Sequence, residues 1–166
     1  MMRDSLKRPP EPDLVKIRVP LDGAARESGF DSETLWGEPL GGNRYRIWNL
    51  PVFAYNLDMR AIVRCDPDPN GGLPVAVQLL EPGDCYVVRL YFTGSASDAD
   101  IQAVLDLLST RNALFEKYNT RIWAVGLRSV EDYEWLGSAL DPYVRDGVLE
   151  FESGLQADQP VLGDAG

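Results

Sequence analysis

Pairs of glutamates are the residues whose spacing comes closest to a catalytic arrangement in this sequence. Glu150 and Glu152 are two residues apart, which places both side chains on one face of a strand, and Glu33 and Glu38 lie in another strand-like segment. Two carboxyl groups that share a cleft can act as general acid and general base. Exposed strand faces carry glutamate just as freely, so carboxylate catalysis is the least favoured role for these residues.

Other common catalytic and metal-binding arrangements are absent from the sequence. The chain has no histidine and two cysteines, which excludes Ser-His-Asp and Cys-His catalysis as well as Cys₄ zinc sites. Residues 66–71 copy the first half of an EF-hand calcium loop, but Val77 stands where the bidentate glutamate belongs. We therefore predict no catalytic residues, no metal and no cofactor, and we predict that Cys65 and Cys85 are unpaired.

Three aromatic residues, Trp48, Phe53 and Tyr55, gather around a proline in the segment 48–55. Such a segment can form the wall of an apolar pocket with a few polar groups at its mouth. The favoured alternative is that the rings cover the end of a small barrel as core, because small barrels are filled by side chains. If a pocket forms, it lies between the two lobes that the rest of the pattern predicts.

Residues 14–82 have the pattern of a small β-barrel-like lobe within an α+β protein. Residues 14–21 alternate apolar and polar side chains, as half-buried strands do. Residues 41–43 are Gly-Gly-Asn, which tolerate positive φ and favour a hairpin turn. Five short strands are expected, and together they predict a closed or half-closed barrel. They cover residues 14–21, 34–40, 44–48, 61–65 and 74–80.

Residues 83–152 have the pattern of a ferredoxin-like βαββαβ lobe. Apolar residues from Ile101 to Leu108 recur at helical spacing after a capping Ser97 or Asp98, and the pattern breaks before a turn at Asn119. Two right-handed crossovers place both helices on one face of a four-stranded sheet. The expected elements are strands at 85–92, 113–118, 121–127 and 148–151, with helices beginning at about residue 98 and covering 131–145.

The face of this sheet away from the helices carries further candidate binding residues. Strand alternation predicts that Ile122 and Ala124 point to the helices and that Trp123 points away from them. RNA-recognition platforms share this outline, but their aromatic, glycine-rich signature is missing, and packing against the first lobe is the favoured use. The candidate binding residues are Trp48, Phe53 and Tyr55 of the first lobe and Arg89, Tyr91 and Trp123 of this open face.

The net charge of −10 disfavours nucleic acid as a partner, because it repels phosphate. Most of the excess follows Pro82: fourteen acids and six bases, against twelve acids and ten bases up to that residue. Charge of this kind can simply keep a protein soluble. It can also form one negative surface, over two helices on the same side, for a basic protein partner. The candidate acidic surface consists of Asp98, Asp100, Asp106, Glu131 and Glu134.

Both ends of the chain, residues 1–13 and 153–166, are predicted to be flexible tails. The first of them is polar and rich in proline and has no apolar region of the kind that directs export. No apolar run approaches the roughly 18 residues that cross a bilayer. We therefore expect a cytoplasmic protein with no membrane contact.

The stretch from Glu33 to Tyr55, ETLWGEPLGGNRYRIWNLPVFAY, resembles the bacterial domain of unknown function 4265 family. Members of that family carry a similar block, then a valine-rich strand like residues 61–65, and an ending like residues 148–152; the likeness covers residues 14–153. The family often has Gly-Asp before the valine-rich strand, whereas this sequence has Asp58-Met-Arg. The resemblance implies a bacterial cytoplasmic protein and brings no established activity.

Three functions are compatible with these features. The first is a non-catalytic interaction module, such as an immunity or antitoxin-like protein that neutralises a basic partner; the acidic charge, small size and missing catalytic residues favour it. The second is a small-molecule-binding module with an aromatic pocket between the lobes, and the third is a carboxylate-dependent enzyme. Fold class does not choose among them. Gene neighbourhood does, because a neutralising protein is encoded beside its target.

Overall fold

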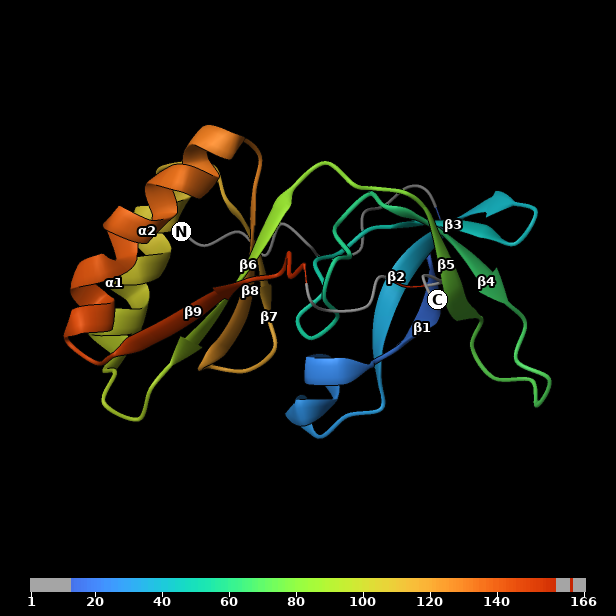
Figure 1. The fold of residues 1–166 in the computed structure, drawn as a ribbon, viewed down its shortest axis with the longest axis horizontal. Helices are drawn as coiled ribbons and strands as arrows, with labels where there is room; N and C mark the ends of the chain where they lie inside the picture. Colours follow the sequence, from blue (N-terminus) through green and yellow to red (C-terminus); the bar gives the residue numbers. More distant parts are fainter. Residues whose placement is uncertain (1–12, 158–161, 163–166) are drawn as a thin grey trace.

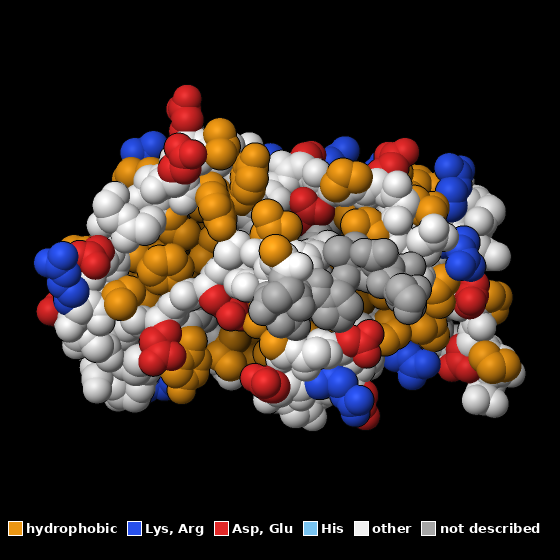
Figure 2. Space-filling model, in the orientation of Figure 1, with side chains coloured by type: hydrophobic (Ala, Val, Ile, Leu, Met, Phe, Trp, Pro, Cys, Tyr) orange, Lys and Arg blue, Asp and Glu red, His pale blue; other side chains and the backbone are white. Residues whose placement is uncertain are grey.

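The structure, a computed structural model, describes residues 13–157 and residue 162. It has a mixed α+β architecture, with a closed five-stranded barrel and a second sheet that carries two helices. Figure 1 shows the barrel on the right and the helix-covered sheet on the left. Acidic and basic side chains are scattered over both parts on the face seen in Figure 2. Apart from Asp13, the predicted N-terminal tail lies outside the described residues.

Five short strands form the closed barrel. They are β1 Val15–Pro20, β2 Ser32–Gly41, β3 Arg44–Ile47, β4 Ile62–Asp66 and β5 Val75–Glu81, and a short 3₁₀ helix, η1 Gly23–Ser28, precedes β2. Consecutive strands pair antiparallel, and β1 pairs in parallel with β5 to close the barrel. Ile17, Leu35 and Val63 fill the interior, as alternation predicts. The predicted barrel is therefore confirmed as a closed one.

The second sheet has four antiparallel strands and carries both helices on one face, as Figure 1 shows. Its elements are β6 Tyr86–Phe92, α1 Asp98–Ser109, β7 Leu114–Lys117, β8 Ile122–Leu127, α2 Val130–Arg145 and β9 Leu149–Ser153. The strand order is β7-β8-β6-β9. Ser97 begins α1 through a capping box with Asp100. The predicted turn is also present, with the Asn119 side chain accepting the N–H groups of Arg121 and Ile122.

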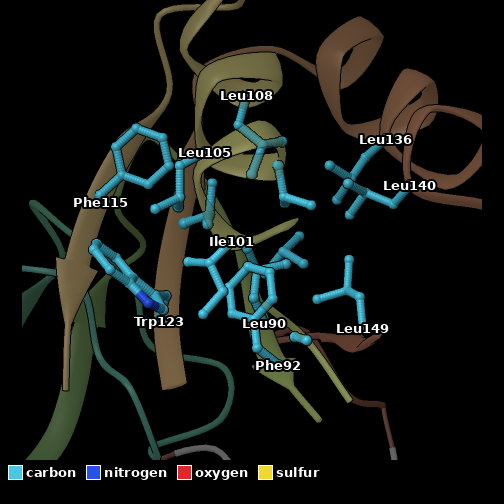
Figure 3. Close-up of a cluster of buried hydrophobic side chains, with 14 of the residues drawn as sticks. Leu90, Phe92, Ile101, Leu105, Leu108, Phe115, Trp123, Leu136, Leu140 and Leu149 are labelled. Carbon is cyan, nitrogen blue, oxygen red and sulfur yellow. The ribbon is translucent and has the colours of Figure 1, made fainter. Parts of the chain in front are cut away.

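The core under the helices corrects one predicted binding residue. Trp123 is buried with Leu105 and Phe115 on the helix side of the sheet (Figure 3) and is not on the open face. Leu90 and Trp123 lie directly opposite each other across β6 and β8, so they share one face, and Ile122 takes the other. The prediction of which β8 side chains point to the helices was wrong because β8 is apolar on both faces. Its sequence therefore does not alternate between apolar and polar residues.

The open face of the second sheet packs against the first part of the chain through the segment that follows β3. Leu50 and Val52 form a buried cluster with Val87 and its neighbours on this face. Gly126 allows the close approach, because a Cβ there would lie 2.9 Å from a methyl carbon of Leu50. This is the packing that was predicted as the favoured use of the face.

The hydrogen-bonded fold extends past residue 152, where the second lobe was predicted to end. Ser153 ends β9, and the Gly154 N–H donates to the Val87 carbonyl at 2.7 Å. Asn56 and Gln156 then exchange two side-chain to backbone hydrogen bonds, each 2.9 Å long. These bonds join the end of the second sheet to the segment between β3 and β4.

Cys65 and Cys85 are both free and buried. Burial raises the pKa of each thiol to about 12, so the reactive thiolate is scarce at neutral pH. We expect a disulfide reagent such as dithionitrobenzoate to label neither thiol in the native protein while it labels both in urea, as absorbance and intact mass would report. Rapid labelling of either cysteine without denaturant would contradict this burial.

Candidate functional site

Glu33 fixes the irregular segment between β3 and β4. Its Oε2 accepts the Val52 N–H at 2.6 Å, and its Oε1 accepts those of Phe53 at 3.2 Å and Ala54 at 3.1 Å. Burial raises the pKa of this carboxyl, and the three N–H groups and the Arg89 guanidinium oppose that rise. The carboxylate thus supplies partners to backbone donors that no strand or helix satisfies.

Arg89 on β6 is a buried cation whose hydrogen-bonding capacity is incompletely used. It is 8% exposed, and its Nη2 donates to the Ala54 carbonyl. Its Nη1 lies 3.6 Å from Glu152 Oε1, and its Nε has no hydrogen-bond partner among the described residues. Desolvation lowers the pKa of the guanidinium, and the Glu33 carboxylate opposes this effect. A buried donor without an acceptor is costly, so this donor calls for an explanation.

Tyr55 covers the guanidinium and ties it to β9. The ring centroid lies 4.2 Å from Arg89 Cζ, and the hydroxyl donates to Glu152 Oε1 at 2.7 Å. Burial and the neighbouring Glu152 raise the pKa of the Tyr55 hydroxyl, which keeps it a donor at neutral pH. Glu152 itself lies directly opposite Arg89 across β6 and β9. These three side chains link the segment after β3 to the second sheet.

A pocket of about 330 Å³ lies beside this unit, between η1, the segment after β3, and strands β6 and β9. The Tyr91 ring on its wall is 46% exposed. The pocket therefore joins aromatic walls from both lobes. Four of the six predicted binding residues line it, namely Phe53, Tyr55, Arg89 and Tyr91.

Two acidic residues of β9 line the same pocket. Glu150 and Glu152 are both exposed and lie opposite Tyr91 and Arg89, respectively, across β6 and β9. Glu152 is engaged by Tyr55 and Arg89. The Glu150 carboxylate has no partner within the part of the chain that the structure describes. Since Arg89 is covered, the charge that this pocket presents to solvent is negative.

Trp48, also predicted to bind, lies outside this pocket. Its Nε1 donates to Glu38 Oε2 at 2.8 Å, and the Arg60 guanidinium lies 5.3 Å from its ring centroid. Glu38 also pairs with Arg46 at 3.2 Å. Glu33 and Glu38 therefore act separately: Glu33 binds backbone N–H groups, and Glu38 binds the half-buried side chains of Arg46 and Trp48.

The sequence identified Glu33, Glu150 and Glu152 as carboxylates but not as parts of this site. A usable signal existed for Glu152, because an arginine on β6 and a glutamate on its neighbour β9 form a favourable cross-strand pair. No comparable sequence signal existed for the role of Glu33. Its partners begin 19 residues later in a segment without a regular pattern.

The five acids of the predicted acidic surface lie on α1 and α2. Asp100 is committed to the capping box, where the Ser97 N–H lowers the pKa of its carboxyl. On the face seen in Figure 2, acidic side chains stand among hydrophobic and basic ones and do not form one continuous surface. The other four acids of the predicted acidic surface are exposed: Asp98, Asp106, Glu131 and Glu134.

Within the described ranges, no group of three or more histidine, cysteine or acidic side chains could hold a metal ion. Among the same residues, neither helix has the length and apolar character needed to cross a bilayer. The charged residues that line the pocket are Glu150, Glu152 and Arg89.

A family model described as "Domain of unknown function (DUF4265)" matches residues 33–151. The chain belongs to this family. The matched range of this DUF4265 chain begins at Glu33 and contains Arg89, Tyr91 and Glu150. No curated protein matches it. It is similar to a solved structure described as "Novel crystal structure of a hypothetical protein from Neisseria gonorrhoeae", with a TM-score of 0.70 and 17% identity over 87% of this chain and 96% of that one. At this identity the likeness shows the fold alone.

Proposed function

We propose that this chain is a non-catalytic interaction module that binds a cationic group of a basic partner in the pocket between the barrel and the second sheet. An immunity or antitoxin-like neutraliser in the bacterial cytoplasm is one form of such a module. The observation that carries the proposal is the Glu150 carboxylate, which has no partner among the described residues and lies across the strand pair from the exposed Tyr91. A carboxylate next to an aromatic face suits an ammonium or guanidinium group.

The charges around the pocket favour a cation over an anion. Within the pocket, an anionic ligand would meet the exposed Glu150 and Glu152 before it reached Arg89, the basic residue of the lining. Arg89 is 8% exposed, lies against the Tyr55 ring and faces Glu152 at 3.6 Å. The positive charge of Arg89 is therefore offset within the protein, and the exposed Glu150 and Glu152 attract an incoming cation.

This site replaces the helices as the place where the acidic charge acts. Both locations carry exposed glutamates, but the pocket adds concave shape and aromatic walls. A free amine or another small cation could occupy the same space, since about 330 Å³ is at the lower end of ligand-pocket sizes.

The second lobe that frames the pocket has the βαββαβ element order, and we propose that it is ferredoxin-like, with the lobe boundary at residues 82 and 83.

A fragment titration tests the proposal. Pentylammonium is expected to shift the amide NMR signals around Glu150, Tyr91 and Tyr55 in a saturable manner, and neutral pentanol is expected to shift them less. Glu150→Gln should weaken the ammonium response by about fivefold, the loss of roughly 1 kcal/mol.

Glu134→Gln is the matched control, because it removes the same charge from an exposed position on α2. It should leave the pentylammonium response unchanged. Equal weakening by both variants would mean that net charge alone attracts the cation. Unsaturable shifts spread over the helices would also overturn the proposal.

A further inference from the structure

Residues 150–152 of β9 line the pocket, and β9 is an edge strand of the second sheet. Resting on the proposed function above, we infer that the basic partner docks as an extended strand on the edge of β9 with which no described strand pairs. It would add a fifth strand to the sheet and place basic side chains beside the pocket. Backbone hydrogen bonds would supply affinity, and the charged pocket would supply specificity.

The backbone of β9 presents an alternating set of free groups at this edge. The Thr93 N–H donates to the Val148 carbonyl, and the Gly154 N–H donates to the Val87 carbonyl. Hydrogen-bonded pairs alternate along antiparallel strands, so Glu150 and Glu152 between these points also turn their backbone groups to β6. The N–H and carbonyl of Phe151 then point outward, where no strand pairs with them among the described residues.

The side chains of β9 define the sequence that an added strand should have. Glu150 and Glu152 lie on the pocket side, and Phe151, opposite Leu90, lies on the helix side and is 37% exposed. Directly opposed residues of paired strands interact, and opposite charges there are favourable. The partner strand is therefore expected to read basic, apolar, basic at three consecutive positions.

Charged residues on an edge strand often serve to prevent pairing with other chains. That role needs no cavity, whereas Glu150 and Glu152 frame a pocket whose wall contains the nine-tenths buried Arg89. The Nε of Arg89 lacks an acceptor in the described part of the chain. The basic side chains of a docked strand would meet Glu150 and Glu152, whereas the Arg89 Nε is buried and out of reach of a strand at the outer edge of β9.

Selective N-methylation of a peptide provides the test. The probe is a seven-residue peptide of alternating lysine and valine, and its binding to the full chain is measured by calorimetry. Two isomers are methylated on alternate amides, one set in each. Because alternate N–H groups of a strand point in opposite directions, one isomer should bind at least tenfold more weakly than the parent, and the other should bind nearly as well.

Hydrogen exchange and a pair of variants give an independent measurement. The parent peptide should slow exchange of the Phe151 N–H. Phe151→Pro, which removes that N–H without breaking a bond to β6, should weaken binding more than Phe151→Ala does. Circular dichroism of both variants checks that they fold. If Phe151→Pro does not fold, the two peptide isomers decide whether the partner docks as a strand.

The outcomes separate this inference from the proposed function. If both isomers bind as tightly as the parent, or both lose binding equally, strand docking is overturned while pentylammonium still binds and the pocket stands. If neither the parent peptide nor pentylammonium binds, both proposals fall. If replacing lysine by norleucine leaves affinity unchanged, docking does not use the charges of Glu150 and Glu152, and the inference fails.

Discussion

Replacing Arg89 with alanine is expected to lower the free energy of unfolding by about 3–5 kcal/mol, as the loss of one partner of a buried ion pair does. The substitution leaves the Glu33 carboxylate without its nearby cation and removes the donor to the Ala54 carbonyl. It also frees the Tyr55 ring, which lies against the guanidinium. Urea unfolding followed by tryptophan fluorescence measures the change.

Arg145→Ala is the matched control for this loss. Arg145 pairs with Asp141 one helical turn away at 2.8 Å, and its side chain is 79% exposed. Such a surface pair contributes at most about 0.5 kcal/mol. If the two variants unfold within about 1 kcal/mol of each other, burial of the Arg89 guanidinium costs as much as its contacts contribute, and the proposed linking role of Arg89, Tyr55 and Glu152 is lost.

The strands of the barrel could be predicted because two local signals agree there. The alternation of side chains in β1 indicates which of them point into the barrel. Gly41, Gly42 and Asn43, all at positive φ, indicate the turn between β2 and β3. The helix α1 was equally readable, since its cap and apolar stripe agree. The short helix η1 was not predicted, because six residues are too few to show a helical period.

The candidate site was harder to predict, because register and long-range contacts assemble it. Tyr91 and Arg89 meet Glu150 and Glu152 only when β9 pairs with β6 in one register. Trp123 was misplaced for a related reason, since β8 is buried on both faces and nothing in its own sequence distinguishes them. Phe53 and Tyr55 could be proposed from the aromatic segment alone. Their position depends on Glu33, which contacts that segment from another strand.

Glu33→Ala is expected to lower the free energy of unfolding by about 3 kcal/mol, because it leaves buried backbone donors of three residues without an acceptor. Glu33→Gln keeps one acceptor oxygen but turns an amide toward the same donors, and we expect a loss of about 2 kcal/mol. Glu38→Gln, in the same strand, serves as the control. Its carboxylate accepts from two side chains, Arg46 and Trp48, in a half-buried position and not from backbone donors, so its loss should be smaller.

The cost of Glu33→Gln should also depend on pH, and the sign follows from the direction of the pKa shift. Desolvation raises the pKa of the Glu33 carboxyl above its ordinary value of 4.5. The folded state then holds this proton more tightly than the unfolded state, so stability from Glu33 is fully present below pH 4.5 and declines as the pH rises through the folded pKa. Wild type should therefore gain stability over the Gln variant as the pH is lowered from neutrality. Urea unfolding of both proteins between neutral pH and pH 4.5 measures the gap; a gap that narrows on acidification would mean that the three N–H groups and Arg89 outweigh desolvation and hold Glu33 ionised.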